Sequence, residues 1–213
     1  MAKDKISYII GRVNNQLVDD GFIHWPKDKL LESFNDAQRA VVTMRPDANV
    51  VDFEFTCVQG TRQSMPDDGV RLIDVLNTAA GYAIRSRDKK QLTELYPEWY
   101  GTVDSIPEAF VYDERQPKFF FLFPGVTAGL KVDMVYSAIP PIRDILEIEE
   151  PADLDTAYSN AIIEYMLYMA HSKDFEYSEQ VKANTHFQMF MGIMGAKTEA
   201  DTGMSPTAPD RKE

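Results

Sequence analysis

Apolar residues recur every three or four positions at the start of the chain, which is the spacing of an amphipathic helix. The first stripe consists of Ile6, Ile9, Ile10, Val13 and Leu17. It predicts a helix over about residues 4–19. After Gly21, a second stripe predicts a helix between Trp25-Pro26 and Arg45-Pro46. This stripe consists of Leu30, Phe34, Ala37 and Val41. Since each stripe must be buried, the two helices should pack together or on a partner.

From about residue 50 the period falls to two, which predicts β-strands. Val51, Phe53, Phe55 and Cys57 alternate with polar residues. Further strands are expected at residues 61–64, 72–75, 82–86 and 130–136. Asp88 is expected to cap a short helix that ends at Tyr96-Pro97. These strands should form a compact antiparallel layer.

The stretch from Tyr112 to Pro124 is typical of a β-hairpin. A polar turn at residues 113–117 leads into Phe119–Phe123, a run of high β propensity that Pro124 is expected to stop. Four phenylalanines in five residues cannot face water on both sides. Either the rest of the domain or a neighbouring subunit must bury them.

The helical period returns in the last third of the chain. An acidic link over residues 147–155 leads into a helix with an apolar face, and a second helix is expected to end at Gly192 and Gly195. That apolar face consists of Leu154, Tyr158, Ala161, Ile162, Tyr165 and Met169. The sequence therefore predicts an α+β protein in which an antiparallel β region is inserted into a bundle of N- and C-terminal helices. The expected parts are helices at 1–48, a β-rich insertion at 49–146, helices at 147–195 and a flexible tail at 196–213 that orders on binding.

Charge and composition narrow the functions. The net charge of −12 repels phosphate, so free nucleic-acid binding is not expected as the main task. No apolar segment approaches the roughly 18 residues of a membrane helix, and we expect a protein made and assembled in the cytosol. Cys57 is the single cysteine, and we interpret it as a small buried apolar side chain rather than as a metal ligand.

Motifs that carry catalysis are missing from the sequence. It contains no phosphate-binding glycine loop, no GxSxG and no HExxH. The histidines, His24, His171 and His186, fall in three elements, and Glu164 has no acid–base partner at helical spacing. No catalytic, metal or cofactor site is predicted. The acidic link is interpreted as a solvated segment that places Asp153 or Asp155 at a helix N-terminus.

One basic cluster stands out in this acidic chain, and it has two interpretations. It consists of Arg85, Arg87, Lys89 and Lys90. It is either a solvated loop or a contact to an acidic partner surface or to passing DNA.

Four segments carry a resemblance to a known family. They are HWPKDKLLESFNDAQRAVVTMRPDA at His24–Ala48, GTRQSMPDDGVRLIDV at Gly60–Val75, FVYDERQPKFFFLFPG at Phe110–Gly125 and AYSNAIIEYMLYMAHSKDFEYSEQVKANTHFQMF at Ala157–Phe190. In order and spacing, over about Ile6 to Gly195, the chain resembles the head-to-tail adaptor proteins of tailed bacteriophages, in particular the tail tubular A type of short-tailed phages.

The resemblance implies a virion protein of the neck, assembled in the host cytoplasm as a ring of about twelve subunits. Its partners would be other copies of itself, the portal protein, a tail nozzle or tail tube protein, and double-stranded DNA that passes the lumen without specific binding. The implied portal contacts lie at Gly195, Lys197, Met204, Pro206 and Arg211. The implied tail contacts lie at Asp113, Glu114, Arg115, Gln116 and Lys118.

Two alternatives remain open at this stage. The chain would be a binding protein of another kind, such as an assembly chaperone or a tail-completion factor, if it were absent from the finished particle or placed elsewhere in it. It would be a metal-dependent hydrolase if the acidic link and a histidine together held a metal ion.

Overall fold

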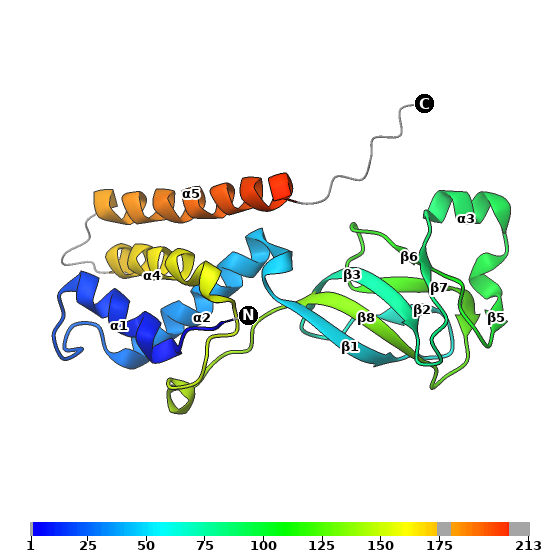
Figure 1. Cartoon of the computed structure of the whole chain (residues 1–213), viewed down its shortest axis with the longest axis horizontal. Coiled ribbons are helices and arrows are strands. Elements are labelled where there is room, and N and C mark those ends of the chain that lie inside the picture. Colours follow the sequence, from blue (N-terminus) through cyan, green and yellow to red (C-terminus); the bar gives the residue numbers. More distant parts are fainter. Residues whose placement is uncertain (1, 174–179, 205–213) are drawn as a thin grey trace. The chain divides into compact units, whose positions relative to one another are not determined.

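The computed structural model describes residues 2–173 and 180–204 of the chain (Figure 1). These residues form five α-helices and eight β-strands, so the predicted α+β class is confirmed. The chain divides into two compact units. We call residues 1–45 together with 140–213 the helical unit, and residues 46–139 the β unit.

Four α-helices make up the helical unit: α1 (Ile6–Leu17), α2 (Lys27–Met44), α4 (Ser159–Lys173) and α5 (Gln180–Met204). α4 contacts α1, α2 and α5, and Figure 1 shows it running alongside α5. The two stripes predicted from the sequence lie in this core. The fully buried positions include Ile6, Ile9, Ile10 and Val13 of α1, and Phe34, Ala37 and Val41 of α2.

α5 is longer than the sequence indicated. The expected end at Gly192 and Gly195, with a tail from Ala196, is wrong because α5 continues to Met204. A glycine inside a helix costs only about 1 kcal/mol relative to alanine. Phe190 and Met194 are each 1% exposed, so packing holds the helix through both glycines. The remainder of the expected tail, residues 205–213, lies outside the described residues.

The β unit contains two sheets. The first is antiparallel in the order β1 (Val50–Thr56), β8 (Lys131–Ala138) and β3 (Gly69–Thr78). The second has the order β2 (Gly60–Ser64), β7 (Phe119–Val126), β6 (Ala109–Tyr112) and β4 (Arg85–Ser86), and β5 (Val103–Asp104) also pairs with β7. The layer is not wholly antiparallel as predicted, since β4 pairs with β6, and β5 with β7, in parallel.

The phenylalanine run is buried within the β unit itself. Phe120 and Leu122 face a core shared with residues of the first sheet, whereas Phe121 packs on the other side with Trp99 and Val111. Of the two explanations for its burial, the domain rather than a neighbouring subunit therefore covers most of the run.

Pro124 does not end the strand as predicted, because β7 continues to Val126. The pairing of β2 with β7 shifts register between Gly60 and Arg62, whose partners are Val126 and Phe121. The proline therefore lies where the ladder is already interrupted and its missing N–H is tolerated.

Gly125 has no room for a side chain. A Cβ atom there would lie 2.6 Å from the carbonyl oxygen of Thr102 and 2.8 Å from the backbone nitrogen of Thr61. Gly125→Ala is therefore expected to lower the free energy of unfolding of the β unit by about 1–3 kcal/mol. Urea denaturation followed by the fluorescence of Trp99 in a Trp25→Phe background measures this change. The control is Gly101→Ala in the same unit, since a Cβ at Gly101 meets nothing within 4 Å; equal losses in both variants would contradict the steric explanation.

Candidate interaction surfaces

The part of the chain that the structure describes contains no group of three or more metal-ligating side chains. Cys57 is buried, and burial raises the pKa of its thiol to about 11. A thiol with a high pKa is a poor nucleophile and a poor metal ligand at neutral pH.

Two of the histidines meet between α4 and α5, which spacing alone did not reveal. The rings of His171 and His186 stack with centroids 5.4 Å apart. His186 Nδ1 lies 2.7 Å from Glu164 Oε2, so the partner that Glu164 lacks on its own helix comes from α5. His24 lies apart from them just before α2, with its ring 5.5 Å from that of Trp25. This arrangement joins two helices.

The predicted basic cluster lies on β4, on Arg87 directly after it and on the start of α3 (Lys89–Leu95). Asp88 caps α3 by accepting hydrogen bonds from the backbone N–H groups of Lys90 and Gln91, which confirms the predicted cap. Lys89 Nζ lies 5.4 Å from the centre of the Phe121 ring. The exposed side chains of Arg85 and Arg87 form no ion pair with any described residue.

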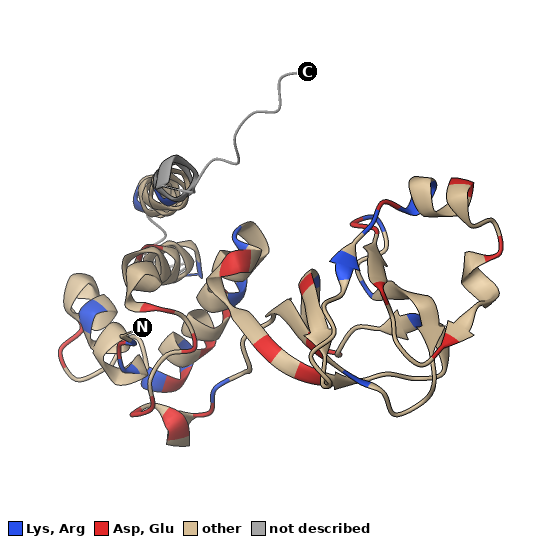
Figure 2. Ribbon diagram, turned by 45° about the vertical axis from the view of Figure 1, so that its right-hand side comes forward, with Lys and Arg blue, Asp and Glu red and all other residues tan. Residues whose placement is uncertain are grey.

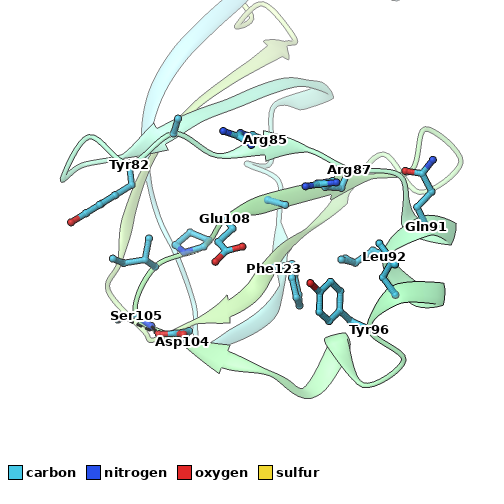
Figure 3. Close-up of a pocket in the computed structure, with 15 residues that line it drawn as sticks. Tyr82, Arg85, Arg87, Gln91, Leu92, Tyr96, Asp104, Ser105, Glu108 and Phe123 are labelled. Carbon is cyan, nitrogen blue, oxygen red and sulfur yellow. Dashed lines mark hydrogen bonds between the residues drawn. The ribbon is translucent and has the colours of Figure 1, made fainter.

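These two arginines line a cavity of about 640 Å³, which we call the β4–α3 groove. Figure 3 shows Leu92 and Tyr96 of the α3 segment at one end of it and Tyr82 toward the other. The remaining lining residues that matter here are apolar Phe123 and Ile106, and acidic Asp104 and Glu108. Asp104 and Glu108 also form no ion pair with a described residue. The groove is therefore a partly apolar hollow lined by charged residues of both signs, and Glu108 lies beside Arg85, whose backbone N–H donates to the Glu108 carbonyl oxygen.

The predicted tail-contact segment is a tight hairpin tip. Asp113 Oδ1 accepts a hydrogen bond from the backbone N–H of Arg115, and Gln116 N–H donates to the Asp113 carbonyl oxygen. Two of the five candidates are held by β3: Glu114 forms an ion pair with Arg71, and Lys118 Nζ donates to the carbonyl oxygen of Gly69. Arg115 and Gln116 are the exposed candidates that β3 does not hold.

A second rigid turn, which the sequence did not indicate, leads into the acidic link. It is built around the 3-10 helix η3 (Ile145–Glu147) and carries a capping box between Asp144 and Glu147. The backbone N–H of Asp144, followed by the guanidinium of Arg143, lowers the pKa of Glu147. The apolar side chain of Leu146 is 91% exposed at the tip. The ribbon in Figure 2 is red, the colour of Asp and Glu, at this turn and at positions along β1.

Arg143 fixes this turn to the helical unit. Its guanidinium forms ion pairs with Asp153 and Glu147, and hydrogen bonds to Asp153 raise its pKa. Gln38 of α2 holds Asp153 by donating to its carboxylate and accepting from its backbone N–H. Asp155 does cap the following helical segment, as predicted, by accepting from the N–H of Ala157. Asp153 instead serves as the partner of Arg143.

The predicted portal contacts lie on α5 or beyond it. Gly195 and Met204 lie within α5, and Lys197 Nζ is 4.9 Å from the ring centre of Tyr158. Pro206 and Arg211 lie outside the described residues. Away from α4, α5 exposes large apolar side chains, namely Val181, Met189 and Met191.

None of the helices in residues 2–173 and 180–204 has the length and apolar character needed to cross a membrane.

The chain was compared with known proteins and protein families. No curated protein matches the chain. A family model described as SU10 adaptor protein matches residues 5–210. The chain therefore belongs to the SU10 adaptor protein family, and its resemblance to phage head-to-tail adaptors is confirmed.

Proposed function

We propose that this adaptor forms a ring of about twelve subunits below the portal of a short-tailed phage, joins the portal to the tail and lets DNA pass through its centre. The observation that carries the proposal is the family match over residues 5–210, since the adaptor family implies association with portal and tail proteins in the virion neck. The protein acts by binding and not by catalysis.

Two surfaces would make the outer contacts. α5 and the residues after it, including Gly195, Lys197, Met204, Pro206 and Arg211, would bind the portal. The apolar side chains on the exposed side of α5 support this assignment, because contiguous exposed apolar surface is typical of interaction sites. The hairpin tip with Arg115 and Gln116 would face the tail.

DNA would pass without being held. The net charge of −12 disfavours adhesion to phosphate, and acidic residues such as Asp52 and Glu54 on β1 extend over the surface of the β unit. A lumen with this charge would let DNA slide during packaging and ejection.

Quantitative mass spectrometry of purified virions tests the proposal by counting this chain against the portal protein. We expect a ratio near one to one, because a ring matched to the portal requires equal copy numbers. The capsid protein of the same particles serves as the internal standard. Absence from the particle would contradict the proposal and would favour an assembly chaperone; a ratio far below one would favour a tail-completion factor.

A further inference from the structure

We propose that the η3 turn of one subunit docks into the β4–α3 groove of the next subunit in the ring. By the η3 turn we mean residues 142–150, with Leu146 at its tip. The occupant is thus a second copy of this chain, and the inference rests on the proposed ring. Leu146 would enter the groove, and the acidic side of the turn would face Arg85 and Arg87.

The η3 turn exposes a cluster of apolar side chains, and we call this turn the knob. Leu146 is 91% exposed, Ile142 68% and Ile145 42%, so three large apolar side chains within five residues face outward. Single exposed apolar residues are normal on a protein surface, but a cluster on a fixed turn marks an interaction site.

The turn is also held in place before any partner arrives. Asn35 bridges both backbone groups of Arg143, accepting from its N–H at 3.0 Å and donating to its carbonyl oxygen at 3.1 Å. With the Arg143 ion pairs and the capping box, little of the turn remains to be ordered on binding. A preorganised contact loses less entropy when it forms.

The groove fits such a knob in size and chemistry. Its volume of about 640 Å³ accommodates several aliphatic side chains, and Phe123, Leu92 and Tyr96 offer them apolar contacts. Within a chain that carries an excess of acidic residues, Arg85 and Arg87 stand exposed without an anionic partner among the described residues.

Charge determines how the knob would enter. Asp144 and Glu150 on the turn form no ion pair with described residues, whereas Glu147 and Glu149 pair with Arg143 and Lys5. The acidic side of the turn is therefore attracted to the β4 wall of the groove. Asp104, which Figure 3 shows across the groove from the two arginines, repels the same carboxylates. Complementary charges of this kind fix orientation and exclude the reversed arrangement.

The two surfaces differ, so the contact is heterologous. The knob belongs to the helical unit and the groove to the β unit, and a subunit that offers its knob to one neighbour leaves its groove open for another. Repetition of such a contact closes into a ring when the rotation allows it. Many weak copies of one contact then hold the ring together.

Disulfide trapping tests this contact in particles whose adaptor is supplied as the variant Leu146→Cys with Ile106→Cys. Ile106 lines the groove and is 38% exposed. Cys57 contributes little background, because its thiol is buried and its pKa is raised to about 11. We expect mild oxidation to give a ladder of covalent oligomers longer than dimers on non-reducing gels. Either single variant alone should give none, and a mixture of the two single variants should give dimers only.

Reversing the charge of Arg87 is a second test of the same contact. Arg87→Glu in the double-cysteine chain should reduce the yield of the ladder at least tenfold, and adding Glu150→Arg should restore much of it. Arg62→Glu on β2 is the matched control, because it makes the same charge change on an exposed arginine that lies outside the groove and outside the proposed portal and tail contacts. A ladder that Arg87→Glu leaves unchanged would overturn the assignment of the charged wall.

The other outcomes separate this inference from the proposed function. Particles that contain the adaptor at the copy number of the portal but give no ladder would overturn the docking and leave the ring intact. A bond formed only within single chains would also overturn it. If the ladder required deletion of residues 205–213, that segment would be the true occupant of the groove. Absence of the chain from particles would instead remove the proposed function.

Discussion

Arg143→Ala is expected to lower the free energy of unfolding of the helical unit by about 3 kcal/mol. The guanidinium is the cation that balances Asp153, whose side chain is only 12% exposed. Without it, the carboxylate would keep its hydrogen bond from Gln38 but would have lost its counter-ion in a poorly hydrated place. Removing one partner of a largely buried ion pair lowers the free energy of unfolding by far more than the intact pair adds to it, because the remaining charge has no counter-ion.

Urea denaturation of a Trp99→Phe variant would measure this loss, since Trp25 then reports on the helical unit alone. Lys29→Ala is the matched control, as Lys29 and Glu32 form an ion pair with both side chains more than half exposed. It should change the free energy of unfolding by less than about 1 kcal/mol. If the two variants lost equally little, the Arg143 pairs would not be what fixes the η3 turn.

Phe120→Ala should lower the free energy of unfolding of the β unit by about 3–5 kcal/mol, because it leaves a large cavity in a closed core. Phe120 is fully buried on the central strand β7, and its ring packs edge-on against that of Phe55 at 5.6 Å between centroids. β7 is paired on both sides, so the surrounding backbone cannot collapse easily into the space.

The Trp25→Phe background serves for this measurement, with Trp99 as the reporter of the β unit. Phe53→Ala is the control on β1, where the side chain is 44% exposed and also forms one edge-on aromatic contact, with Tyr136. A loss below about 1 kcal/mol for Phe120→Ala would contradict the closed core that the structure gives Phe120 within the β unit.

Local patterns in the sequence predicted most of the elements. The stripes of α1 and α2, the alternation in β1 and β8 and the cap at Asp88 all depend on neighbours a few residues away, and all are confirmed. The predictions failed where distant contacts prevail over local preference. α5 passes two glycines because α4 supports it, and β7 passes Pro124 at a break in its ladder.

The surfaces were predictable only in part. The basic cluster could be predicted because its residues are close together in the sequence. The groove, however, is also lined by residues from Asp104 to Glu108, which come after α3 in the chain. Residues 147–150 of the η3 turn were expected to belong to a solvated acidic link. The rigidity of the turn comes from Asn35 and Gln38 of α2, which bind Arg143 and Asp153 more than 100 residues further along the chain and meet them only in the folded unit.

The insertion of the β unit between α2 and α4 has a consequence for synthesis. The ribosome makes α1 and α2 first, and residues 46–139 must follow before α4, which packs against both helices, can emerge. At about 5–20 residues per second this delay is on the order of ten seconds. The β unit is continuous in the chain and can fold during that interval, while the apolar stripes of α1 and α2 still lack their cover. The η3 turn is translated after the β unit, and its anchor on α2 forms only with the last helices, so a nascent chain presents its groove before it presents its knob.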